Sequence, residues 1–459
     1  MIAILAALLG GALFYLSQGL DDCWYAAWVA AAPLLWLAYG RTPTWQVVAA
    51  SAFAATGATV YAIQCYGLMA APLIVFAAGS FPIAVAFSRR VHRRGNPWIT
   101  LLAYPLCWTS IEFLVGLLSP HGSFGSFAYS QVSAPVLIQS ASLLGLYAVT
   151  FLICLFSNAV ALALCAGRRA IGPVALAMGL CAANCVFGLV RLARPQAEAV
   201  RVAAIADEST TEHAWSARTL PEARAVAETL ARSVRRAAEE GATFIVTPEG
   251  GVVCRSAWRS AVLEPFAEVS RETGAQVIVG VVESKPAANV AYSLRPEGTP
   301  QAYTKRHPVP VLEDEFTPGH DSGWLGGGKA MEICKDMDFP TTIRRDAALG
   351  VRLAAVPSGD FHLDGWIHAR MAVMRGVENG FAIVRTAHNG LLTATDAQGR
   401  IVARRPADPS GPTIVVADLP LGRGPTLYTR IGDAFGWVCL VGLAGLVLAA
   451  QKLSKERVD

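Results

Sequence analysis

Charged residues are scarce in this chain, and their scarcity sets its class. Only 16% of the 459 residues are charged and 54% are hydrophobic, whereas a soluble domain carries about 25% charged residues. Residues 1–40 contain no Lys, Arg or His. The formal net charge of +4 comes without a basic stripe interleaved with aromatics, which argues against a nucleic-acid-binding protein. Much of the chain is therefore expected to face lipid.

Several common catalytic and binding motifs are also missing. No Gly-x-Ser-x-Gly elbow is present, which argues against a Ser–His–Asp hydrolase. The stretch 326–329, Gly-Gly-Gly-Lys, lacks the glycine spacing and the Ser/Thr of a phosphate-binding loop. Asp360, His362, Asp364 and His368 are grouped like metal ligands, but their spacing matches no zinc signature. We therefore predict no metal and no cofactor.

The ten cysteines do not suggest a disulfide framework. Eight lie in or beside apolar segments, where a thiol behaves as a small hydrophobic group: Cys23, Cys65, Cys107, Cys154, Cys165, Cys181, Cys185 and Cys439. The polar part of the chain holds only Cys254 and Cys334. Pairing these two would consume the thiol identified below as the candidate nucleophile, so we predict no structural disulfide.

Apolar segments long enough to cross a bilayer fill the first 193 residues and recur near the C-terminus. A spanning helix needs about 17–25 residues. Eight segments qualify: 2–19, 24–40, 44–63, 68–88, 98–117, 135–166, 170–191 and 432–451. The first lacks a basic n-region and an obvious cleavage site, so we interpret it as a helix and not as a signal peptide. We expect about eight transmembrane helices.

Basic residues gather in alternate connections between these segments. They are Arg41, then Arg89, Arg90, Arg93 and Arg94, then Arg168 and Arg169, and finally the tail 451–457. Connections rich in Lys and Arg remain cytoplasmic. With eight spans, both termini are then cytoplasmic, and the polar block between the seventh and eighth spans lies outside the cytoplasm. The expected domains are a seven-helix bundle at 1–193, an extracytoplasmic domain at 194–430, and a last helix with a short tail at 431–459.

The block 194–430 has the pattern of one α/β domain. Helical spacing predicts helices at 221–241 and 366–378. Short apolar runs predict strands at 200–206, 243–247, 275–282, 290–294, 330–333, 351–356, 381–385 and 413–417. Strands that alternate with helices over this length indicate a single domain with a sizeable core.

Three polar residues stand at or just past the ends of these apolar runs: Glu249, Lys305 and Cys334. A thiolate is a strong nucleophile, but a free thiol is mostly protonated at neutral pH. Glu249 could remove the proton as general base. Lys305, with backbone N–H groups just after Cys334, could stabilise the oxyanion that forms when the sulfur attacks a carbonyl. The three residues therefore predict acyl transfer through a thioester.

Taken one at a time, these residues have ordinary alternatives. A Cys after a strand is usually a core residue, a Glu after Thr-Pro is usually a turn residue, and a Lys is usually solvated. Glu313, eight residues after Lys305, could orient the lysine or assist the base. The sequence around the three residues makes the catalytic interpretation specific.

That sequence resembles the nitrilase (carbon–nitrogen hydrolase) superfamily and, more closely, its membrane branch, the apolipoprotein N-acyltransferases. Glu249 in Thr-Pro-Glu, Lys305 in Lys-Arg-His-Pro-Val-Pro and Cys334 in Cys-Lys-Asp-Met-Asp-Phe-Pro match the family's Glu–Lys–Cys triad, and Glu313 matches its auxiliary glutamate. Further matches lie at 108–112, 129–131, 145–147, 375–380, 389–390, 396–400 and 426–433, together with His368 and Arg385.

The resemblance implies a four-layer αββα sandwich on an eight-helix membrane base, in the inner membrane of a bacterium. It also implies transfer of an acyl chain from a phospholipid to Cys334 and then to the N-terminal amine of a diacylglyceryl-cysteine lipoprotein. Lys335 stands where the family usually has an aromatic residue; it could lower the thiol pKa or reshape the acyl pocket, and with Asp336 we count it as auxiliary. We expect the enzyme to be a monomer.

Two other functions remain open at this stage. A membrane-anchored amidase would use the same triad, with water in place of the amine, on a small or lipidic amide. A non-catalytic binding or scaffold protein that kept the fold would show no effect of Cys334→Ala on lipid composition or on lipoprotein processing.

Overall fold

The computed structural model describes residues 1–195 and 198–455. Gln196, at the predicted domain boundary, and the last four residues of the predicted tail lie outside the described residues. The chain forms two compact units. The first comprises residues 1–119, 123–193 and 431–459, and the second comprises residues 194–430 together with Pro120–Gly122. We call them the helical unit and the catalytic unit.

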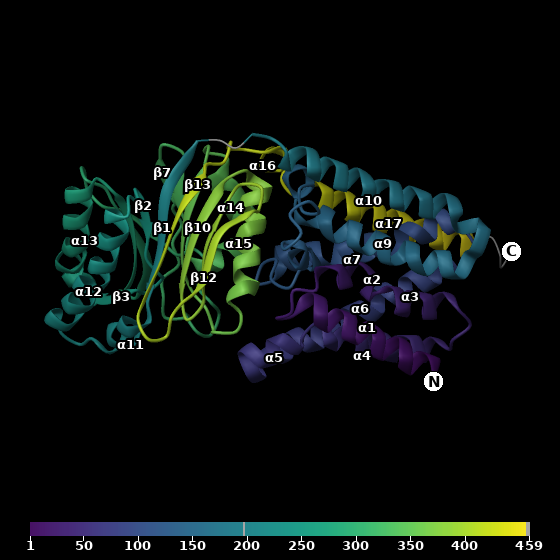
Figure 1. Cartoon of the computed structure of the whole chain (residues 1–459). Helices are drawn as coiled ribbons and strands as arrows, with labels where there is room; N and C mark the ends of the chain where they lie inside the picture. The colour runs from purple at the N-terminus through teal and green to yellow at the C-terminus, as the bar shows by residue number, and fades with distance from the viewer. Residues whose placement is uncertain (196–197, 456–459) are drawn as a thin grey trace. The chain divides into compact units, whose positions relative to one another are not determined.

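The helical unit consists of apolar helices with mostly short connections, apart from the long stretch between α7 and α8 (Figure 1). Its α-helices are α1 (Ile2–Gln18), α2 (Ala27–Ala30), α3 (Ala32–Tyr39), α4 (Thr44–Gly57), α5 (Val60–Tyr66), α6 (Ala71–His92), α7 (Pro97–Leu118), α8 (Ala141–Leu144), α9 (Leu146–Ala166), α10 (Ile171–Leu192) and α17 (Ala434–Lys455). Its 3-10 turns are η1 (Trp24–Ala26), η2 (Gly67–Ala70), η3 (Phe127–Gln131) and η4 (Gly167–Ala170). Helix α7 packs against α9 and α17.

Three helical segments in the described part of the chain are long and apolar enough to cross a bilayer: Val60–His92, Pro97–Leu118 and Leu146–Leu192. The last has 47 residues and joins α9 to α10 through η4. Shorter apolar helices cover Ile2–Gln18, Trp24–Tyr39 and Ala434–Ala449. These candidate membrane-spanning helices agree with the expected membrane bundle, and the count of about eight spans stays a prediction. The predicted span 135–166 begins too early, because Gly145, with φ +77°, separates α8 from α9.

A buried carboxylate organises the helical unit next to the end of α7. Glu112 accepts hydrogen bonds from Trp108 Nε1 at 2.9 Å, Ser126 Oγ at 2.6 Å, Thr150 Oγ1 at 2.7 Å and the backbone N–H of Phe127 at 3.0 Å. A buried carboxylate needs such donors to offset its lost hydration. Glu112 thereby fixes the chain at Ser126–Phe127, shortly after α7 ends.

The catalytic unit contains two β-sheets. One has seven strands in the order β13-β1-β2-β4-β5-β6, with β3 paired to β4, and the other has six in the order β12-β11-β10-β9-β8-β7. The first comprises β1 (Ala199–Asp207), β2 (Phe244–Val246), β3 (Val252–Arg255), β4 (Gln276–Ser284), β5 (Ala288–Leu294), β6 (Gln301–Thr304) and β13 (Pro412–Pro420). The second comprises β7 (Trp324–Gly326), β8 (Lys329–Met331), β9 (Leu353–Gly359), β10 (Ala382–His388), β11 (Leu391–Thr395) and β12 (Ile401–Pro406).

Helices cover the outer faces of the sheets. They are α11 (Glu208–Ser216), α12 (Leu220–Glu239), α13 (Arg259–Thr273), α14 (Pro340–Ala347) and α15 (Gly365–Asn379), with the short α16 (Leu427–Ile431) at the end of the unit and the 3-10 turns η5 (Ser256–Trp258) and η6 (Cys334–Asp338). In Figure 1, α12 and α13 lie on one side of the strands, and α14 and α15 lie on the other.

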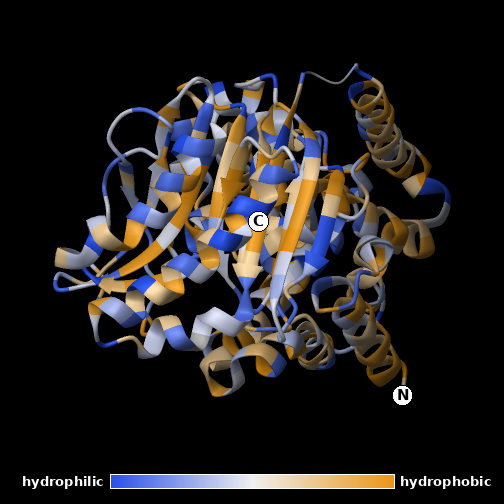
Figure 2. Cartoon of the chain, turned by 60° about the vertical axis from the view of Figure 1, so that its left-hand side comes forward, coloured by the Kyte–Doolittle hydropathy of each residue, from blue (hydrophilic) through white to orange (hydrophobic). Residues whose placement is uncertain are grey.

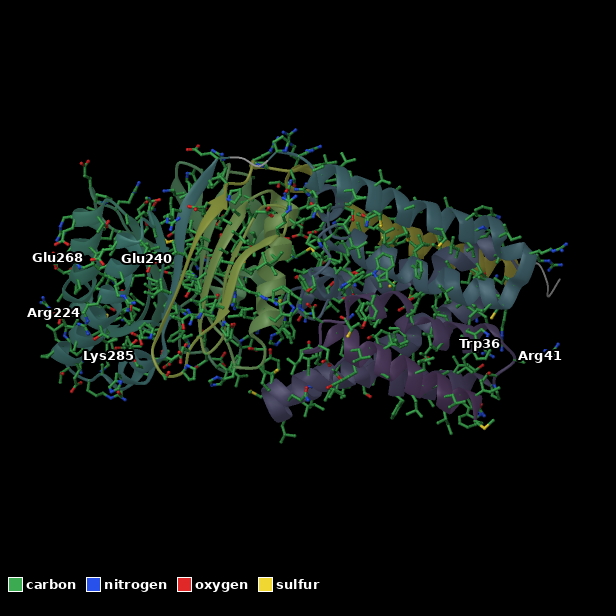
Figure 3. The ribbon with its side chains drawn as sticks, in the orientation of Figure 1. Trp36, Arg41, Arg224, Glu240, Glu268 and Lys285 are labelled. Carbon is green, nitrogen blue, oxygen red and sulfur yellow. The ribbon has the colours of Figure 1, made fainter. Side chains whose placement is uncertain are left out.

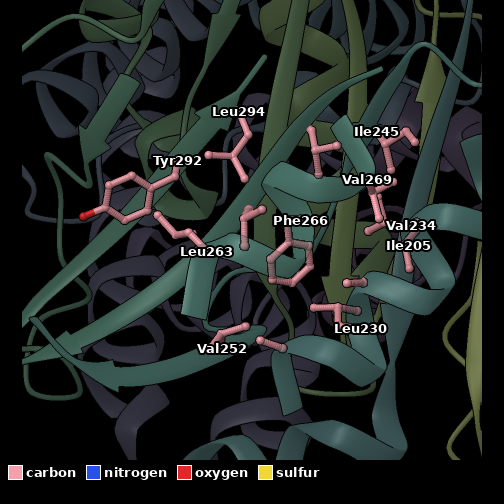
Figure 4. Packing of buried hydrophobic residues seen from close by; sticks show 14 of the residues in the cluster. Ile205, Leu230, Val234, Ile245, Val252, Leu263, Phe266, Val269, Tyr292 and Leu294 are labelled. Carbon is pink, nitrogen blue, oxygen red and sulfur yellow. The ribbon is translucent and has the colours of Figure 1, made fainter. Parts of the chain in front are cut away.

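Three buried clusters hold these layers together. Leu230 of α12 and Phe266 of α13 pack on the seven-stranded sheet (Figure 4). Between the sheets lie residues such as Phe244 and Val384, and Ile343 of α14 packs with Ala372 of α15 on the six-stranded sheet. The layer order is therefore αββα.

Hydropathy and charge follow the same layering. The strands are coloured mostly hydrophobic in Figure 2, whereas the outer helices carry both kinds of residue. Exposed charges such as Arg224, Glu240 and Glu268 project from the α12–α13 layer (Figure 3). A sheet that is buried on both faces requires apolar residues on both, whereas a helix at the surface needs only one apolar face.

Candidate active site

Glu249 occupies a turn that follows β2. The Thr247 N–H donates to the Ile278 carbonyl at 2.9 Å, and the Glu249 N–H donates to the Ser358 carbonyl at 3.2 Å. The turn packs tightly on β4, because a Cβ at Gly280 would lie 2.1 Å from the Pro248 carbonyl oxygen. Glu249 thus links the two sheets and is itself buried.

Lys305 follows β6 and is almost completely buried, with 1% of its surface exposed. Its Nζ donates to Glu249 Oε1 at 2.7 Å and to the two carboxylate oxygens of Glu313 at 2.9 and 2.7 Å. Two carboxylates around one ammonium give the cluster a formal charge of −1. Burial alone would lower the pKa of Lys305, but the charges of Glu249, Cys334 and Glu313 raise it above its usual value.

An amide side chain completes this cluster. Asn289 Nδ2 donates to Glu249 Oε1 at 2.6 Å and to Glu313 Oε1 at 3.1 Å. Glu313 Oε2 also accepts from the Val309 N–H at 2.6 Å. Burial and the nearby Glu249 charge raise the pKa of Glu313, and Lys305 opposes that rise. Glu313 is therefore suited to hold Lys305 in place and to share a proton with the cluster.

Cys334 is the first residue of η6, shortly after β8 ends, and it is partly exposed. Its φ of +42° lies in the left-handed region, which a residue with a side chain adopts at a cost of about 1–3 kcal/mol. Its Sγ lies 3.6 Å from the carbonyl oxygen of Gly359, the last residue of β9. The turn thus places the sulfur beside the end of β9.

Nearby charges act on this sulfur. Burial and the Glu249 carboxylate raise the pKa of the Cys334 thiol well above its usual value, while the Lys305 and Arg385 cations act in the opposite direction. The thiol therefore carries its proton in the resting site. It becomes a nucleophile only when a neighbouring base removes that proton. Glu249, whose charge acts directly on the sulfur, is the available carboxylate.

Asp336, predicted as auxiliary, joins the lysine loop to the cysteine turn. One carboxylate oxygen accepts from the N–H groups of Arg306 at 3.1 Å and His307 at 2.9 Å and contacts His307 Nδ1 at 2.9 Å. The other accepts from Tyr303 Oη at 2.7 Å and the Ile333 N–H at 3.2 Å. Burial alone would raise the pKa of Asp336, but the contacts with His307, Tyr303 and Arg306 lower it.

Asp336→Asn is expected to reduce the free energy of unfolding by about 3–5 kcal/mol, the usual cost of breaking a buried charged pair. Because the folded-state pKa is depressed, this contribution is complete above the ordinary Asp pKa of about 3.9 and fades as pH falls below it. Denaturant unfolding of the two proteins in detergent at pH 7 and pH 3 measures both effects. A stability difference that stays the same at both pH values would contradict this assignment.

The remaining predicted residues have other partners. The Lys335 ammonium lies 3.1 Å from Asp338 Oδ2 and 3.2 Å from His121 Nδ1. Among the grouped acidic and histidine residues, Asp360 pairs with Arg385, which donates at 3.0 Å to one of its oxygens. His368 Nε2 lies 3.0 Å from Asp364 Oδ2. Within the described residues, no group of three or more His, Cys, Asp or Glu side chains could hold a metal ion.

The sequence did not single out Asn289 or Gly359, and it identified Arg385 only as one of the further matches to the family. Arg385 interrupts the apolar strand β10 and is 2% exposed. An isolated charge within an apolar run is a usable signal of a buried ion pair. Asn289 gave no such signal, because its role depends on strand pairing that brings β5 beside β6.

Two family models match the chain. The model described as "Apolipoprotein N-acyltransferase N-terminal domain" matches residues 10–159, and the model described as "Carbon-nitrogen hydrolase" matches residues 201–425. Together they extend over most of the helical unit and nearly all of the catalytic unit. The second match confirms the prediction of a nitrilase-like α/β domain.

Curated relatives match over a similar extent. An apolipoprotein N-acyltransferase of Geobacter metallireducens is 26% identical, over 99% of this chain and 96% of its own. One of Shewanella oneidensis is 25% identical, over 73% of this chain and 71% of its own. Among solved structures, an amidase from Nesterenkonia sp. has 20% identity and a TM-score of 0.41, covering 52% of this chain and 95% of its own.

Proposed function

We propose that the chain belongs to the apolipoprotein N-acyltransferase family, whose members it resembles over nearly its full length, and that it is a membrane enzyme that acylates the N-terminus of lipoproteins. An acyl chain moves from a phospholipid to Cys334 and then to the α-amine of a diacylglyceryl-cysteine. The observation that supports this chemistry best is the convergence of three strand ends, which brings Glu249 against Lys305 and lets both charges act on the Cys334 sulfur.

The first half-reaction forms a thioester. Glu249 takes the thiol proton, the Cys334 sulfur bonds to the ester carbonyl carbon, and negative charge develops on the carbonyl oxygen. The Lys305 ammonium and the Lys335 backbone N–H stabilise that charge by donating hydrogen bonds to the oxyanion. Each such donor typically stabilises the transition state by about 2.7–4 kcal/mol. The carbon–oxygen bond then breaks, and the lysophospholipid alcohol leaves with the proton from Glu249.

The second half-reaction releases the acyl chain to an amine. The lipoprotein amine attacks the thioester carbonyl, Glu249 accepts the proton lost by the amine, and the carbon–sulfur bond breaks. The sulfur leaves as the thiolate and regains its proton from Glu249. Both steps use one base and one cation, which fits the buried Glu249–Lys305 pair.

The family resemblance and the apolar helices support a proposed setting for this reaction. We propose that the protein resides in a bacterial inner membrane with about eight spans, both termini in the cytoplasm and residues 194–430 outside it. Lifting an acyl chain into water costs about 0.8 kcal/mol per CH₂, so a membrane anchor in the same chain as the catalytic domain keeps the lipid donor within reach. One copy supplies Glu249, Lys305 and Cys334 together, so we propose that it works as a monomer.

Mass spectrometry of lipoprotein N-terminal peptides tests this function. In the bacterium that carries the gene, deletion should leave these peptides diacylated with a free α-amine, and expression of this chain should restore the third acyl group. Triacylated peptides that persist in the deletion strain would contradict the proposal. Release of ammonia or free acid from an amide by the purified protein, without acylation of an amine, would instead favour the membrane-anchored amidase.

The two glutamates should differ in their effect on rate. Glu249→Gln keeps an oxygen that accepts from Asn289 and Lys305 but removes the base, so thioester formation should slow about 10²–10⁴-fold. Glu313→Gln leaves Glu249 and Lys305 as a neutral pair and should slow it less. Stopped-flow measurement of acyl-enzyme formation compares the variants. A larger loss for Glu313→Gln than for Glu249→Gln would assign the base to Glu313.

A further inference from the structure

The backbone at the nucleophile needs support from its surroundings. Cys334 has a φ of +42°, and a residue with a side chain keeps such a conformation only where neighbouring contacts enforce it. Asp336 supplies one contact on the N-terminal side of the turn, at the Ile333 N–H. The residue directly after the nucleophile, Lys335, supplies another.

Lys335 is buried, with 7% of its surface exposed. A buried ammonium needs partners for its three N–H donors. Two of these partners are Asp338 Oδ2 at 3.1 Å, within the same turn, and His121 Nδ1 at 3.2 Å. Its ammonium also lies 5.9 Å from the centre of the Phe339 ring. These contacts connect the turn to a histidine more than 200 positions earlier in the chain.

His121 belongs to the catalytic unit although its neighbours in sequence do not. Pro120–Gly122 are part of that unit, whereas Ser119 and Ser123 belong to the helical unit. The next residue, Gly122, has a φ of +52°, and a Cβ there would lie 2.3 Å from the Asp338 carbonyl oxygen. Only glycine permits this approach, so the segment Pro120–Gly122 is shaped to lie against the Cys334–Asp338 turn.

The imidazole of His121 is suited to accept a hydrogen bond. Burial and the Lys335 cation lower the pKa of His121, and Asp338 opposes them only in part. A neutral imidazole has one nitrogen that accepts and one that donates. With Lys335 as donor, Nδ1 is the acceptor.

We propose that His121 is a positioning residue for the nucleophile: it accepts a hydrogen bond from Lys335 and so holds the turn that carries Cys334. The segment Pro120–Gly122 lies between two helices of the helical unit in the sequence. The geometry of the Cys334 thiol thereby depends on a segment far from residues 194–430 in the sequence. His121 would position the Cys334 thiol in this way whether an amine or water receives the acyl group.

The test is the burst of p-nitrophenolate from p-nitrophenyl butyrate, measured on the full chain in detergent. In this reaction the Cys334 sulfur bonds to the butyryl carbon, the bond to p-nitrophenolate breaks, and the thiol proton passes to Glu249. The burst of Cys334→Ala is subtracted to remove acylation at other residues. The probe needs neither a phospholipid nor a lipoprotein.

His121→Leu should lower the burst rate constant roughly tenfold, as expected for loss of a hydrogen bond to a charged group, with no change in the ester concentration that gives half the maximal rate. His121→Asn should keep most of the rate, because its Oδ1 can take the place of Nδ1. In a Lys335→Met background, His121→Leu should cause no further loss, since coupled residues are not additive. His320→Leu, a change at an exposed loop histidine, is the matched control and should behave as wild type.

Two results would overturn the proposal: a normal burst in His121→Leu, or losses from His121→Leu and Lys335→Met that simply add in the double variant. Thermal unfolding, which requires no substrate, is measured for the wild type, His121→Leu, Lys335→Met and the double variant. The losses of stability must also be non-additive between positions 121 and 335. A wild-type protein without any Cys334-dependent burst would contradict the proposed function, while the unfolding cycle would still decide the role of His121.

Discussion

Cys334→Ala is expected to abolish acyl transfer. Removal of a catalytic nucleophile typically costs about 10⁶-fold in rate and leaves only background catalysis. In the proposed mechanism the Cys334 sulfur itself bonds to the acyl carbon, so the loss of thioester formation should be complete. The rate of acylation of a diacylglyceryl-cysteine peptide by phospholipid, followed by mass spectrometry, measures the effect.

Cys254 provides the matched control for this variant. It is the other cysteine of residues 194–430, and burial raises its pKa to about 12, so it is a poor nucleophile. It packs in the cluster beneath α12 and α13, to which neither Glu249 nor Lys305 belongs. Cys254→Ala should keep the transfer rate and lose only some stability. If transfer survived Cys334→Ala and were lost in Cys254→Ala, the nucleophile would be Cys254 and not Cys334.

Lys305→Met is expected to damage both folding and catalysis. The methionine would leave Glu249 and Glu313 facing each other without a cation, so that one must take up a proton. Breaking a buried ion pair by removing one partner costs about 3–5 kcal/mol. The same change removes a donor for the oxyanion, which should slow thioester formation by about 10²–10³-fold. Denaturant unfolding and burst kinetics measure the two losses separately.

The control for this change is Lys329, a lysine of the catalytic unit whose side-chain hydrogen bond goes to an amide oxygen. Lys329 on β8 donates to Gln276 Oε1 at 2.9 Å and contacts no carboxylate in the described part of the chain. Lys329→Met should therefore change stability little and leave the burst rate intact. Equal losses of stability in the two variants would show that the Lys305 cluster contributes nothing beyond ordinary packing.

Local patterns were sufficient to predict the three central residues of the proposed site. Glu249, Lys305 and Cys334 each follow a short apolar run, and strand ends are where a sheet exposes functional groups. The α12 helix was equally clear, because Pro221 stands at its start and apolar residues recur at helical spacing. Helix α13 was missed, since Pro265 lies inside it and its surface residues are polar.

What the sequence could not supply is the pairing between distant segments. Asn289 serves both glutamates only because β5 pairs with β6. The sequence identified Asp336 only as part of the motif around Cys334. Its contacts with other segments depend on tertiary folding and could not be predicted from that motif. His121 reads as a loop residue after α7, and nothing near it in sequence indicates that it reaches Lys335.

The most direct measurement is the mass of the Cys334 peptide after incubation of the purified protein with phospholipid. We predict an added acyl chain on Cys334 that hydroxylamine removes, as a thioester requires, and that passes to the amine when a diacylglyceryl-cysteine peptide is added. An unmodified Cys334 in a protein that still acylates the peptide would contradict the account, as would an acyl group that water removes and the amine does not receive.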